Sequence, residues 1–498
     1  MPAPPPPAAS GDIEVDVCVV GSGFSGLGMG IHLKREGRRS FVILEKAGSV
    51  GGTWRENTYP GCACDISSHL YSFSFAPKAD WSRMYPTQPE IRDYLEDCAT
   101  RFEVRGHMRF HSRVERADYD AVDRVWRVKL ADGSTVTARA LISGMGGLHK
   151  PLLPDVPGVG NSGVGKFKGP AFHSAQWDHS VDLAGKTVAV IGTGASAIQF
   201  VPEIQPKVKA LHLYQRTPPW IVPKQDFAMA RWAQQMFAAA PVTQGALRRY
   251  VWTRNEILGA TLINSTKEHA GQKLAREHIA ANIADPELRA KLTPTFKFGC
   301  KRVLISNDYY AAVAQPNVDL VTQAVQRIAA DGVVTSDGSL READVLIYGT
   351  GFKPFDVLNP TVITGRDGRI LNDDWKRRPE AFLGITVSGY PNFFLLMGPN
   401  TGLGHNSMIY MIESQIQYIM DALRMLDNRG VRAMDVKPGR QKTFNAELEK
   451  RLGGTVWASG CKSWYMSADG KNPAIWPGLT GEYRRRTKKV DEEDYAFL

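Results

Sequence analysis

The chain has 498 residues, of which 43% are hydrophobic and 22% charged, and this composition indicates a water-soluble globular protein with two or three domains. Its net charge of +10 suits an anionic partner, but no basic stripe is interleaved with aromatic residues, which argues against nucleic acid. Such a positive field also attracts anionic nucleotides.

The N-terminus and the cysteines indicate the compartment. No run of about 18 or more apolar residues occurs, so no membrane span is expected. Residues 1–12 are rich in proline and lack the features of a signal peptide, which predicts a flexible tail. The six cysteines are too sparse for a disulfide framework, so a reducing, cytoplasmic location is expected, and Cys62 and Cys64 are interpreted as ordinary thiols.

A first dinucleotide-binding turn is predicted near the N-terminus. An apolar strand over residues 15–20 runs into a G-x-G-x-x-G pattern formed by Gly21, Gly23 and Gly26. A second strand, over residues 41–44, ends at Glu45, 19 residues after Gly26, where a carboxylate accepts hydrogen bonds from a ribose. Because a carboxylate repels a 2′-phosphate, this site favours FAD or NAD over NADP.

A second motif, F-x-G-x-x-x-H-x-x-x-W-D, is not explained by nucleotide binding. It is filled by Phe167, Gly169, His173, Trp177 and Asp178. A linker with a histidine and a tryptophan that belong to the core is the alternative. Its position directly before another nucleotide turn favours a functional signature.

A second nucleotide turn follows this motif. An apolar strand over residues 188–191 leads into the small residues Gly192, Gly194 and Ala197 at a helix start. Arg216 lies 19 residues after Ala197, the same offset as Glu45 after Gly26. A guanidinium there binds a 2′-phosphate bidentately, with Thr217 as a further donor, so NADPH is preferred to NADH. A solvated surface arginine is the alternative.

The pattern of apolar residues changes after the second nucleotide turn. Residues 227–292 carry apolar side chains at helical spacing, which predicts a helical insertion in the second nucleotide domain. Because its charges are mixed, we expect its polar faces to be solvated rather than to form a membrane patch. Lys301 and Arg302 follow as adjacent cations, which by themselves indicate an exposed basic pair.

The F-x-G-x-x-x-H-x-x-x-W-D motif resembles the signature of type I Baeyer–Villiger monooxygenases, flavoproteins that insert one oxygen atom beside a ketone carbonyl. Further segments of the chain match in family order, including GG-x-W at residues 51–54. The resemblance implies an α/β fold of two nested Rossmann-like domains with a helical subdomain. FAD would bind residues 13–148 and 346–498, and NADPH residues 149–345, with the helical insertion over about 226–293.

The resemblance also implies individual roles. Asp65 and Arg302 are expected to be catalytic, with Arg302 in the flavin site and Lys301 on the NADP side, although Asp65 also suits a turn cap. His173 and Trp177 would couple the domains rather than transfer protons. Further FAD-side contacts are implied at Ser25, Thr53, Trp54, Tyr71, Val114 and Met408. Further NADP-side contacts are implied at Thr193, Ala195, Ser196 and Gln199, and no metal site is expected.

The implied reaction uses NADPH to reduce FAD, which then forms a C4a-peroxyflavin with dioxygen and converts a ketone into an ester or lactone. Arg302, oriented by Asp65, would stabilise the oxyanions. Oxidation of sulfur or nitrogen is the nearest alternative, and a flavin disulfide reductase is disfavoured because no C-x-x-C pair occurs. Many cyclic-ketone enzymes carry Ser-Pro-Ser where this chain has Thr401, Gly402 and Leu403, so a cyclic substrate is not assumed.

Overall fold

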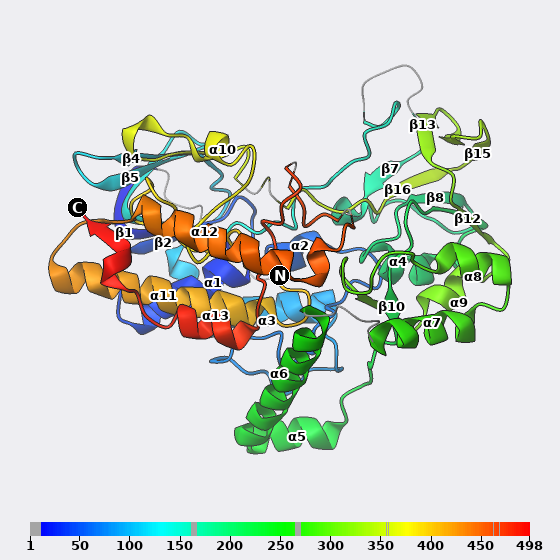
Figure 1. The fold of residues 1–498 in the computed structure, drawn as a ribbon, viewed down its shortest axis with the longest axis horizontal. Coiled ribbons are helices and arrows are strands. Elements are labelled where there is room, and N and C mark those ends of the chain that lie inside the picture. Colours follow the sequence, from blue (N-terminus) through cyan, green and yellow to red (C-terminus); the bar gives the residue numbers. More distant parts are fainter. Residues whose placement is uncertain are drawn as a thin grey trace.

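The computed structural model describes residues 11–160, 167–263, 270–354, 356, 358–461, 463–467 and 469–498. Most of the tail predicted over residues 1–12 lies outside them. Figure 1 shows two lobes, each built around a sheet, with helices α5 and α6 projecting from the body between them. Among the described helices, none combines the length and the apolar character needed to cross a membrane.

The first sheet takes its eight strands from both ends of the chain. Its order is β17-β4-β5-β6-β1-β2-β3, and β18 pairs with β6. Strands β1, β2 and β6 are parallel, whereas β4, β5 and β6 form an antiparallel meander. The bounds are β1 Ile13–Val20, β2 Phe41–Leu44, β3 Met108–Arg109, β4 Val114–Asp120, β5 Val125–Leu130, β6 Thr135–Ser143, β17 Val362–Thr364 and β18 Phe393–Leu395.

Helix α1 (Phe24–Arg35) packs directly on this sheet because two of its positions lack a side chain. A Cβ atom at Gly30 would lie 2.4 Å from Cδ1 of Ile43, and one at Gly28 would lie 2.9 Å from the Phe73 ring. The helix N-terminus therefore stays close to the end of β1. The other helices of this lobe are α2 Thr53–Glu56, α3 Gln88–Arg101, α10 Leu371–Asp374, α11 Met408–Arg429, α12 Pro438–Gly453 and α13 Thr480–Arg486. Near the end of the chain, β20 (Tyr495–Phe497) pairs antiparallel with β19 (Met434–Val436).

The second sheet has five strands, all parallel, in the order β12-β9-β8-β16-β7. Nearly every residue of β8 and β16 is buried, which is typical of a parallel sheet covered on both faces. The bounds are β7 Ala171–His173, β8 Thr187–Ile191, β9 Ala210–Tyr214, β12 Val318–Val321 and β16 Val345–Tyr348, with helices α4 Ala197–Ile204 and α9 Tyr309–Val313 and the antiparallel strands β13 Val325–Ala329, β14 Gly332–Thr335 and β15 Leu340–Glu342 beside them.

The described residues between the short paired strands β10 (Ile221–Val222) and β11 (Leu304–Ile305) form four helices. They are α5 Arg231–Ala239, α6 Pro241–Ile263, α7 Ala270–Asn282 and α8 Pro286–Leu292. Helix α8 begins at Asp285, whose carboxylate accepts hydrogen bonds from the N–H groups of Glu287 and Leu288. The carboxylate satisfies donors that the first turn of a helix leaves unpaired.

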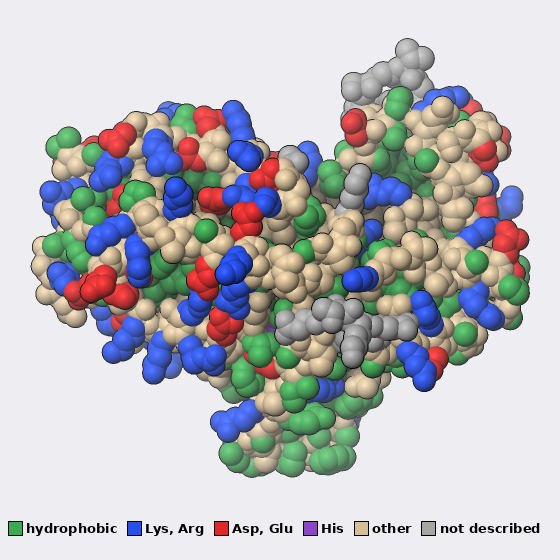
Figure 2. Space-filling model, in the orientation of Figure 1, with side chains coloured by type: hydrophobic (Ala, Val, Ile, Leu, Met, Phe, Trp, Pro, Cys, Tyr) green, Lys and Arg blue, Asp and Glu red, His purple; other side chains and the backbone are tan. Residues whose placement is uncertain are grey.

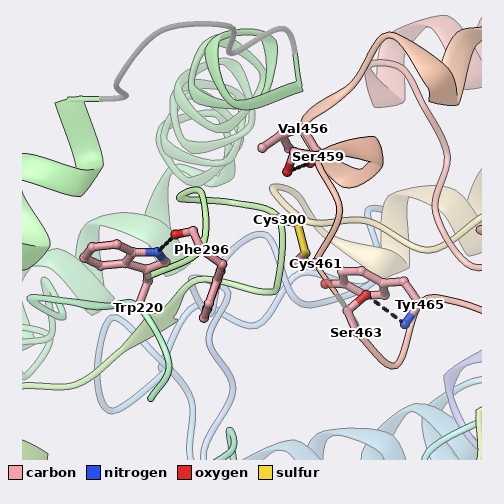
Figure 3. The surroundings of a disulfide bond; sticks show 8 residues. All are labelled: Trp220, Phe296, Cys300, Val456, Ser459, Cys461, Ser463 and Tyr465. Carbon is pink, nitrogen blue, oxygen red and sulfur yellow. Dashed lines mark hydrogen bonds between the residues drawn. A yellow bond between two sulfur atoms is a disulfide. The ribbon is translucent and has the colours of Figure 1, made fainter. Parts of the chain in front are cut away.

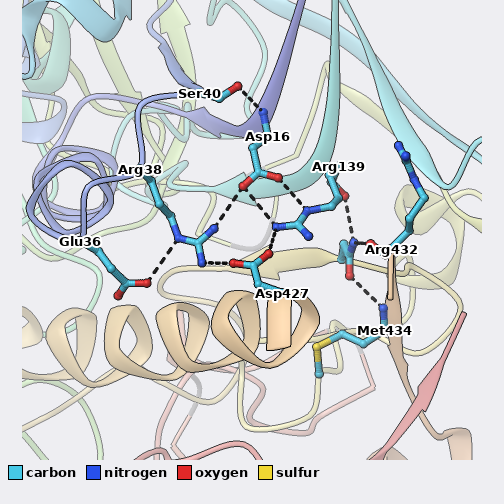
Figure 4. Close-up of polar contacts among 9 residues, drawn as sticks. Asp16, Glu36, Arg38, Ser40, Arg139, Asp427, Arg432 and Met434 are labelled. Carbon is cyan, nitrogen blue, oxygen red and sulfur yellow. Dashed lines mark hydrogen bonds and ion pairs between the residues drawn. The ribbon is translucent and has the colours of Figure 1, made fainter. Parts of the chain in front are cut away.

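A network of four charged side chains joins the first sheet to α11 (Figure 4). Arg139 on β6 pairs with Asp16 on β1 and with Asp427 near the end of α11, with both N–O distances at 2.7 Å. Arg38, in the turn before β2, completes the network with the same two carboxylates, at 3.2 and 2.5 Å. The two arginines are mostly buried, so these ion pairs are less screened than surface pairs.

We predict that Arg139→Gln lowers the free energy of unfolding by about 1.5–3 kcal/mol, because it removes charge-assisted hydrogen bonds to two carboxylates that stay in place. The matched control is Arg116→Gln, which breaks the exposed pair with Asp118 and should cost about 0.2–1 kcal/mol. Urea unfolding of both variants measures the difference. Equal shifts of the midpoint would show that the network is no stronger than a surface pair.

Candidate active site

The first turn has the tight geometry that a pyrophosphate needs. Gly21 has φ +98°, and a Cβ atom at Gly26 would lie 1.8 Å from the carbonyl oxygen of Gly21. Gly52, in the loop before α2, faces Gly23. A Cβ atom on Gly52 would lie 3.1 Å from the Cα atom of Gly23. The three glycines therefore add no side chain to this turn, and Ser25 is buried in the first turn of α1.

Glu45 ends β2 beside this turn and is held there. One carboxylate oxygen accepts hydrogen bonds from the N–H and the hydroxyl of Ser22, at 3.0 and 2.7 Å. The other accepts from the N–H of Ala47 at 2.9 Å and lies 3.3 Å from the Arg55 guanidinium. The acidic residue thus stands where the sequence places a ribose acceptor.

Two of the expected flavin contacts meet above α1. The Trp54 indole donates a hydrogen bond to the Tyr71 hydroxyl at 3.1 Å, and the two rings lie 5.6 Å apart. Tyr71 also packs edge-on against Phe24 at the start of α1, at 5.2 Å. Burial raises the pKa of Tyr71 well above its usual value, so its hydroxyl stays protonated.

The second turn is built like the first. Gly192 has φ +111°, and a Cβ atom there would lie 2.4 Å from the carbonyl oxygen of Gly349, whereas one at Gly194 would meet open space. The Ala197 methyl group lies 3.4 Å from the position of a Cβ on Gly349. Gly194 and Ala195 are exposed at the start of α4, with Thr193 buried behind them and Ser196 partly exposed. The turn is therefore open to an anionic ligand.

Two cations stand together at the end of this sheet. Arg216 is exposed directly after β9, and Thr217 beside it is partly exposed. The Lys301 ammonium lies 4.6 Å from the ring centroid of Phe296. Burial and, secondly, the positive charge of Arg216 lower the pKa of Lys301. A pair of neighbouring cations of this kind would suit a multiply charged anion.

Arg302 and Asp65 form an ion pair across 237 residues of sequence. Nε and Nη2 of Arg302 donate to Oδ2 of Asp65 at 2.9 and 2.5 Å, and Nη1 donates to the carbonyl oxygen of Leu403 at 3.3 Å. Their side chains are 29% and 31% exposed, so the pair is sheltered but open on one side. The negative charge of Asp65 raises the pKa of Arg302, which keeps the guanidinium charged. Asp65 is thus an ion-pair partner rather than only a turn cap, and Arg302 is not an exposed surface cation.

A disulfide lies next to this pair (Figure 3). Cys300, directly before Lys301, is bonded to Cys461, and Tyr465 packs beside them in the same apolar cluster. Burial raises the pKa of Tyr465, an effect that the nearby Arg302 guanidinium opposes. The sparse cysteines predicted no disulfide framework, and they still form none. One pair is nevertheless joined across 161 residues, a separation from which no local spacing predicts a partner.

The signature motif lies between the two lobes. Trp177 packs against Phe200 on α4 at 5.3 Å, and Phe200 packs against Tyr59 from the loop of the first lobe at 6.1 Å. Gln199 clamps the same loop, because its amide accepts from the Tyr59 hydroxyl at 2.9 Å and donates to the Ala63 carbonyl at 3.0 Å. The structure therefore gives Gln199, which the resemblance places at the NADP side, a contact between the lobes.

The remaining signature residues have local structural roles. Nδ1 of His173 accepts a hydrogen bond from the N–H of Ala175 at 3.1 Å, and burial lowers the pKa of His173 to about 4, so its ring is neutral at neutral pH. A Cβ atom at Gly169 would lie 2.2 Å from the Asp344 carbonyl oxygen. Phe167 is buried, and exposed Asp178 accepts from the N–H and the hydroxyl of Ser180 at 2.9 and 2.6 Å.

Other expected contacts are less distinctive. Val114 begins β4 with a buried side chain, and its carbonyl oxygen accepts from the Thr361 hydroxyl at 2.8 Å. Thr53 begins α2, and Met408 begins α11 with a partly buried side chain that packs on the core. Neither the geometry of Val114 nor that of Met408 by itself indicates a ligand.

One buried cluster escaped the sequence analysis. Glu256 on α6 accepts hydrogen bonds from Asn406 at 2.7 Å and from the Thr480 hydroxyl at 2.9 Å. Burial raises its pKa, but hydrogen bonds from His405 and these neighbours outweigh that effect and bring the pKa of Glu256 to about 2. The cluster ties the insertion to the segment that follows Leu403. No local pattern predicts it, because its members are far apart in sequence.

Known proteins identify the family. A Baeyer–Villiger monooxygenase of Pseudomonas aeruginosa is 47% identical over 499 aligned residues, which cover 99% of this chain and 93% of the relative. The chain belongs to the Baeyer–Villiger monooxygenase family. The structure is similar to that of cyclohexanone monooxygenase from Rhodococcus sp. Phi1 bound to NADP+, with 30% identity, a TM-score of 0.87, and coverage of 98% of this chain and 99% of the other. It is also similar to OTEMO in complex with FAD and NADP, with 27% identity, a TM-score of 0.88, and coverage of 97% and 99%.

This membership confirms the two Rossmann-like domains and the Baeyer–Villiger activity, with FAD and NADPH, that the sequence predicted. A model described as pyridine nucleotide-disulphide oxidoreductase matches residues 18–248. That range contains both nucleotide turns but no redox pair, because Cys62 and Cys64 are buried and burial raises the pKa of both thiols.

We predict that His173→Gln reduces oxygenation but leaves flavin bound, because the buried ring holds the segment between β7 and Trp177 in place and transfers no proton. The variant should also lose less stability in acid. Because the pKa of His173 is lowered from about 6.5 to about 4 on folding, the wild-type contribution is complete above pH 6.5 and is lost as the pH falls towards 4. Thermal unfolding at several pH values measures this slope, with exposed His111→Gln as the control. A slope and an activity unchanged by His173→Gln would contradict the assignment.

Proposed function

We propose that Arg302 supplies the fixed positive charge of the oxygenation site and that Asp65 orients it. The observation that carries this proposal is the ion pair between them. Its two hydrogen bonds fix the orientation of the guanidinium plane. A guanidinium keeps its protons at any working pH, so it stabilises an oxyanion without acting as an acid. Arg302 is therefore suited to hold negative oxygen and not to donate a proton.

The first turn, with residues 13–148 and 346–498 around it, is proposed as the FAD site. Its support is the open, glycine-lined start of α1 and the carboxylate of Glu45 beside it. Backbone N–H groups at the helix start would hold the pyrophosphate, and Glu45 would accept from the ribose. Trp54 and Tyr71, joined by their hydrogen bond, would form a wall beside the ring system.

The second turn, within residues 149–345, is proposed as the NADPH site. Arg216 and Lys301 would share the 2′-phosphate, because their mutual repulsion is relieved by a dianion between them. The open space at Gly194 would admit the pyrophosphate. This arrangement favours NADPH over NADH.

Bound FAD, once reduced by NADPH, supplies the activated oxygen that the protein cannot provide. The chain's own residues do the rest. Arg302 would hold the carbonyl oxygen of the ketone as it becomes negative, while the surrounding apolar residues exclude water and strengthen this interaction. The Leu403 carbonyl and Asp65 keep the guanidinium from turning away.

The substrate is proposed to be a ketone that need not be cyclic. Leu403 accepts a hydrogen bond from Arg302 through its carbonyl oxygen, and Gly402 before it is fixed by backbone hydrogen bonds with Ala474 and Trp476. Because this segment differs from the Ser-Pro-Ser run of many cyclic-ketone enzymes, the surroundings of Arg302 would also differ from theirs.

We predict that Arg302→Ala still binds FAD and consumes NADPH but forms no detectable ester. Loss of one fixed cationic donor at a developing oxyanion typically costs a hundred-fold or more, about 3 kcal/mol and above. NADPH consumption should then appear as hydrogen peroxide. NADPH, peroxide and ester are measured together, with Arg302→Lys, which keeps the charge but not the planar fork, expected to recover little. Substantial ester from Arg302→Ala would refute the role.

We predict that Arg216→Ala raises the KM for NADPH about ten- to hundred-fold and leaves the KM for NADH nearly unchanged, because a charge-assisted phosphate contact contributes about 1.5–3 kcal/mol. Steady-state kinetics with both dinucleotides measure this. Lys207→Ala, an exposed cation just beyond α4, is the matched control and should change neither KM. Equal use of both dinucleotides by the unmodified enzyme would exclude the assignment.

A further inference from the structure

An apolar tip stands out from the body of the enzyme at α5 and the start of α6 (Figure 1). Five large apolar side chains are exposed there: Phe227 55%, Trp232 68%, Met236 38%, Val242 79% and Tyr250 63%. Figure 2 shows the corresponding projection as largely hydrophobic on the face in view. Single exposed apolar residues are ordinary, but a cluster of this size on a projecting element marks an interaction surface.

The exposed apolar side chains of the tip do not belong to the faces by which α5 and α6 pack on the rest of the enzyme. Helix α5 already buries its inward face, where Ala233 and Phe237 are covered and the Phe237 ring packs against His69 at 4.9 Å. Gln244 on α6 donates to the Lys78 carbonyl oxygen, and Gln234 on α5 donates to that of Trp81, so both helices are anchored. The exposed apolar side chains therefore belong to a second, outward face.

The charges at the tip have a single sign. Between Phe227 and Asn255 the sequence holds four arginines and no acidic residue. Arg231 and Arg249 are exposed, and neither pairs with an acidic group among the described residues. The nearest acidic side chains are neutralised, because Asp226 is bridged by Arg83 and Lys224, and Asp80 by Lys78. The insertion contains both signs of charge, as expected, but they are separated along the sequence. Its acidic residues begin only at Glu256.

We propose that this tip docks the enzyme onto an anionic lipid surface. Tryptophan and tyrosine are favoured at the boundary between water and lipid, and apolar side chains flanked by unpaired arginines are the signature of a peripheral anchor. Each unpaired arginine would be attracted by the negative surface potential of such a membrane. From the sequence we expected the polar faces of the insertion to be solvated rather than to form a membrane patch, and this proposal departs from that expectation because of the exposed apolar side chains.

The charge also argues against the other simple occupant, a second copy of this chain. Two tips facing each other would bring Arg231 and Arg249 against their equivalents with no acidic residue to pair them. A lipid surface supplies both the missing negative charge and an apolar layer. The inference rests on the tip alone and is independent of the roles proposed for Arg302 and Arg216.

The docked position has a consequence for the reaction. Helix α6 runs from the tip past Glu256, which accepts a hydrogen bond from Asn406. Asn406 lies three residues beyond Leu403 at the proposed oxygenation site. Docking would place the tip end of this helix, rather than its Glu256 end, against the layer in which apolar ketones accumulate. The surface is thus suited to deliver poorly soluble substrates.

The test is sedimentation of the full-length enzyme with vesicles. We expect binding to vesicles of phosphatidylcholine and phosphatidylglycerol in equal parts, much weaker binding to phosphatidylcholine alone, and release by salt. Trp232→Ser should lower the partition coefficient about ten-fold, and Arg231→Gln with Arg249→Gln should do so by a similar factor. Activity on a water-soluble ketone should stay unchanged in these variants, which shows that they fold.

Two controls match the variants. Val122→Ser replaces an apolar side chain that is 90% exposed in the β4–β5 turn of the other lobe, and Lys129→Gln with Lys442→Gln removes two exposed cations far from the tip. Neither control should change vesicle binding. Absence of binding, equal loss in the controls, or equal binding to neutral vesicles would overturn the proposal. So would a dimer, seen by sedimentation velocity without lipid, that Trp232→Ser dissociates.

Discussion

The ion pair between Arg302 and Asp65 is the constraint on which the rest of the site depends. Asp65 follows a loop of the first lobe, and Arg302 follows the helical insertion of the second, so the pair closes only when both lobes hold their relative positions. Its geometry sets the direction of the guanidinium, and its sheltered position preserves the strength of the charge. The disulfide at Cys300 precedes Arg302 by two residues, and the carbonyl oxygen of Leu403 accepts a hydrogen bond from it.

The family signature acquires a physical meaning from the contacts between the lobes. Trp177 contacts Phe200, and Phe200 contacts Tyr59, so the motif supports the loop that leads to Asp65. Gln199 reinforces the same loop from α4. His173 contributes as a neutral, buried ring at the end of β7, beside β16. Through Trp177, Phe200 and Gln199 the motif and its neighbours support the loop that carries Asp65, although the motif contains neither residue of the pair proposed to act in oxygenation.

The local motifs of this fold could be predicted from the sequence because they depend on short spacings. A strand, a glycine turn and a helix follow one another within about a dozen residues, and the offset to Glu45 or Arg216 is set by one further strand. The Asp65–Arg302 pair was reached only through resemblance, since 237 residues separate its members. The Cys300–Cys461 bond and the Gln199 clamp are equally non-local. Helical periodicity predicted α5 and α6, but not which of their faces lacks a partner.

The central claim, that Asp65 acts through Arg302, is tested most directly by a double-mutant cycle on kcat/KM for ester formation, with Asp65→Asn and Arg302→Lys. If Asp65 only orients the guanidinium, Asp65→Asn should cost several-fold in the wild-type background and little in the Arg302→Lys background, because lysine offers no planar fork to orient. Equal, additive losses in the two backgrounds would contradict the account and assign Asp65 a role of its own.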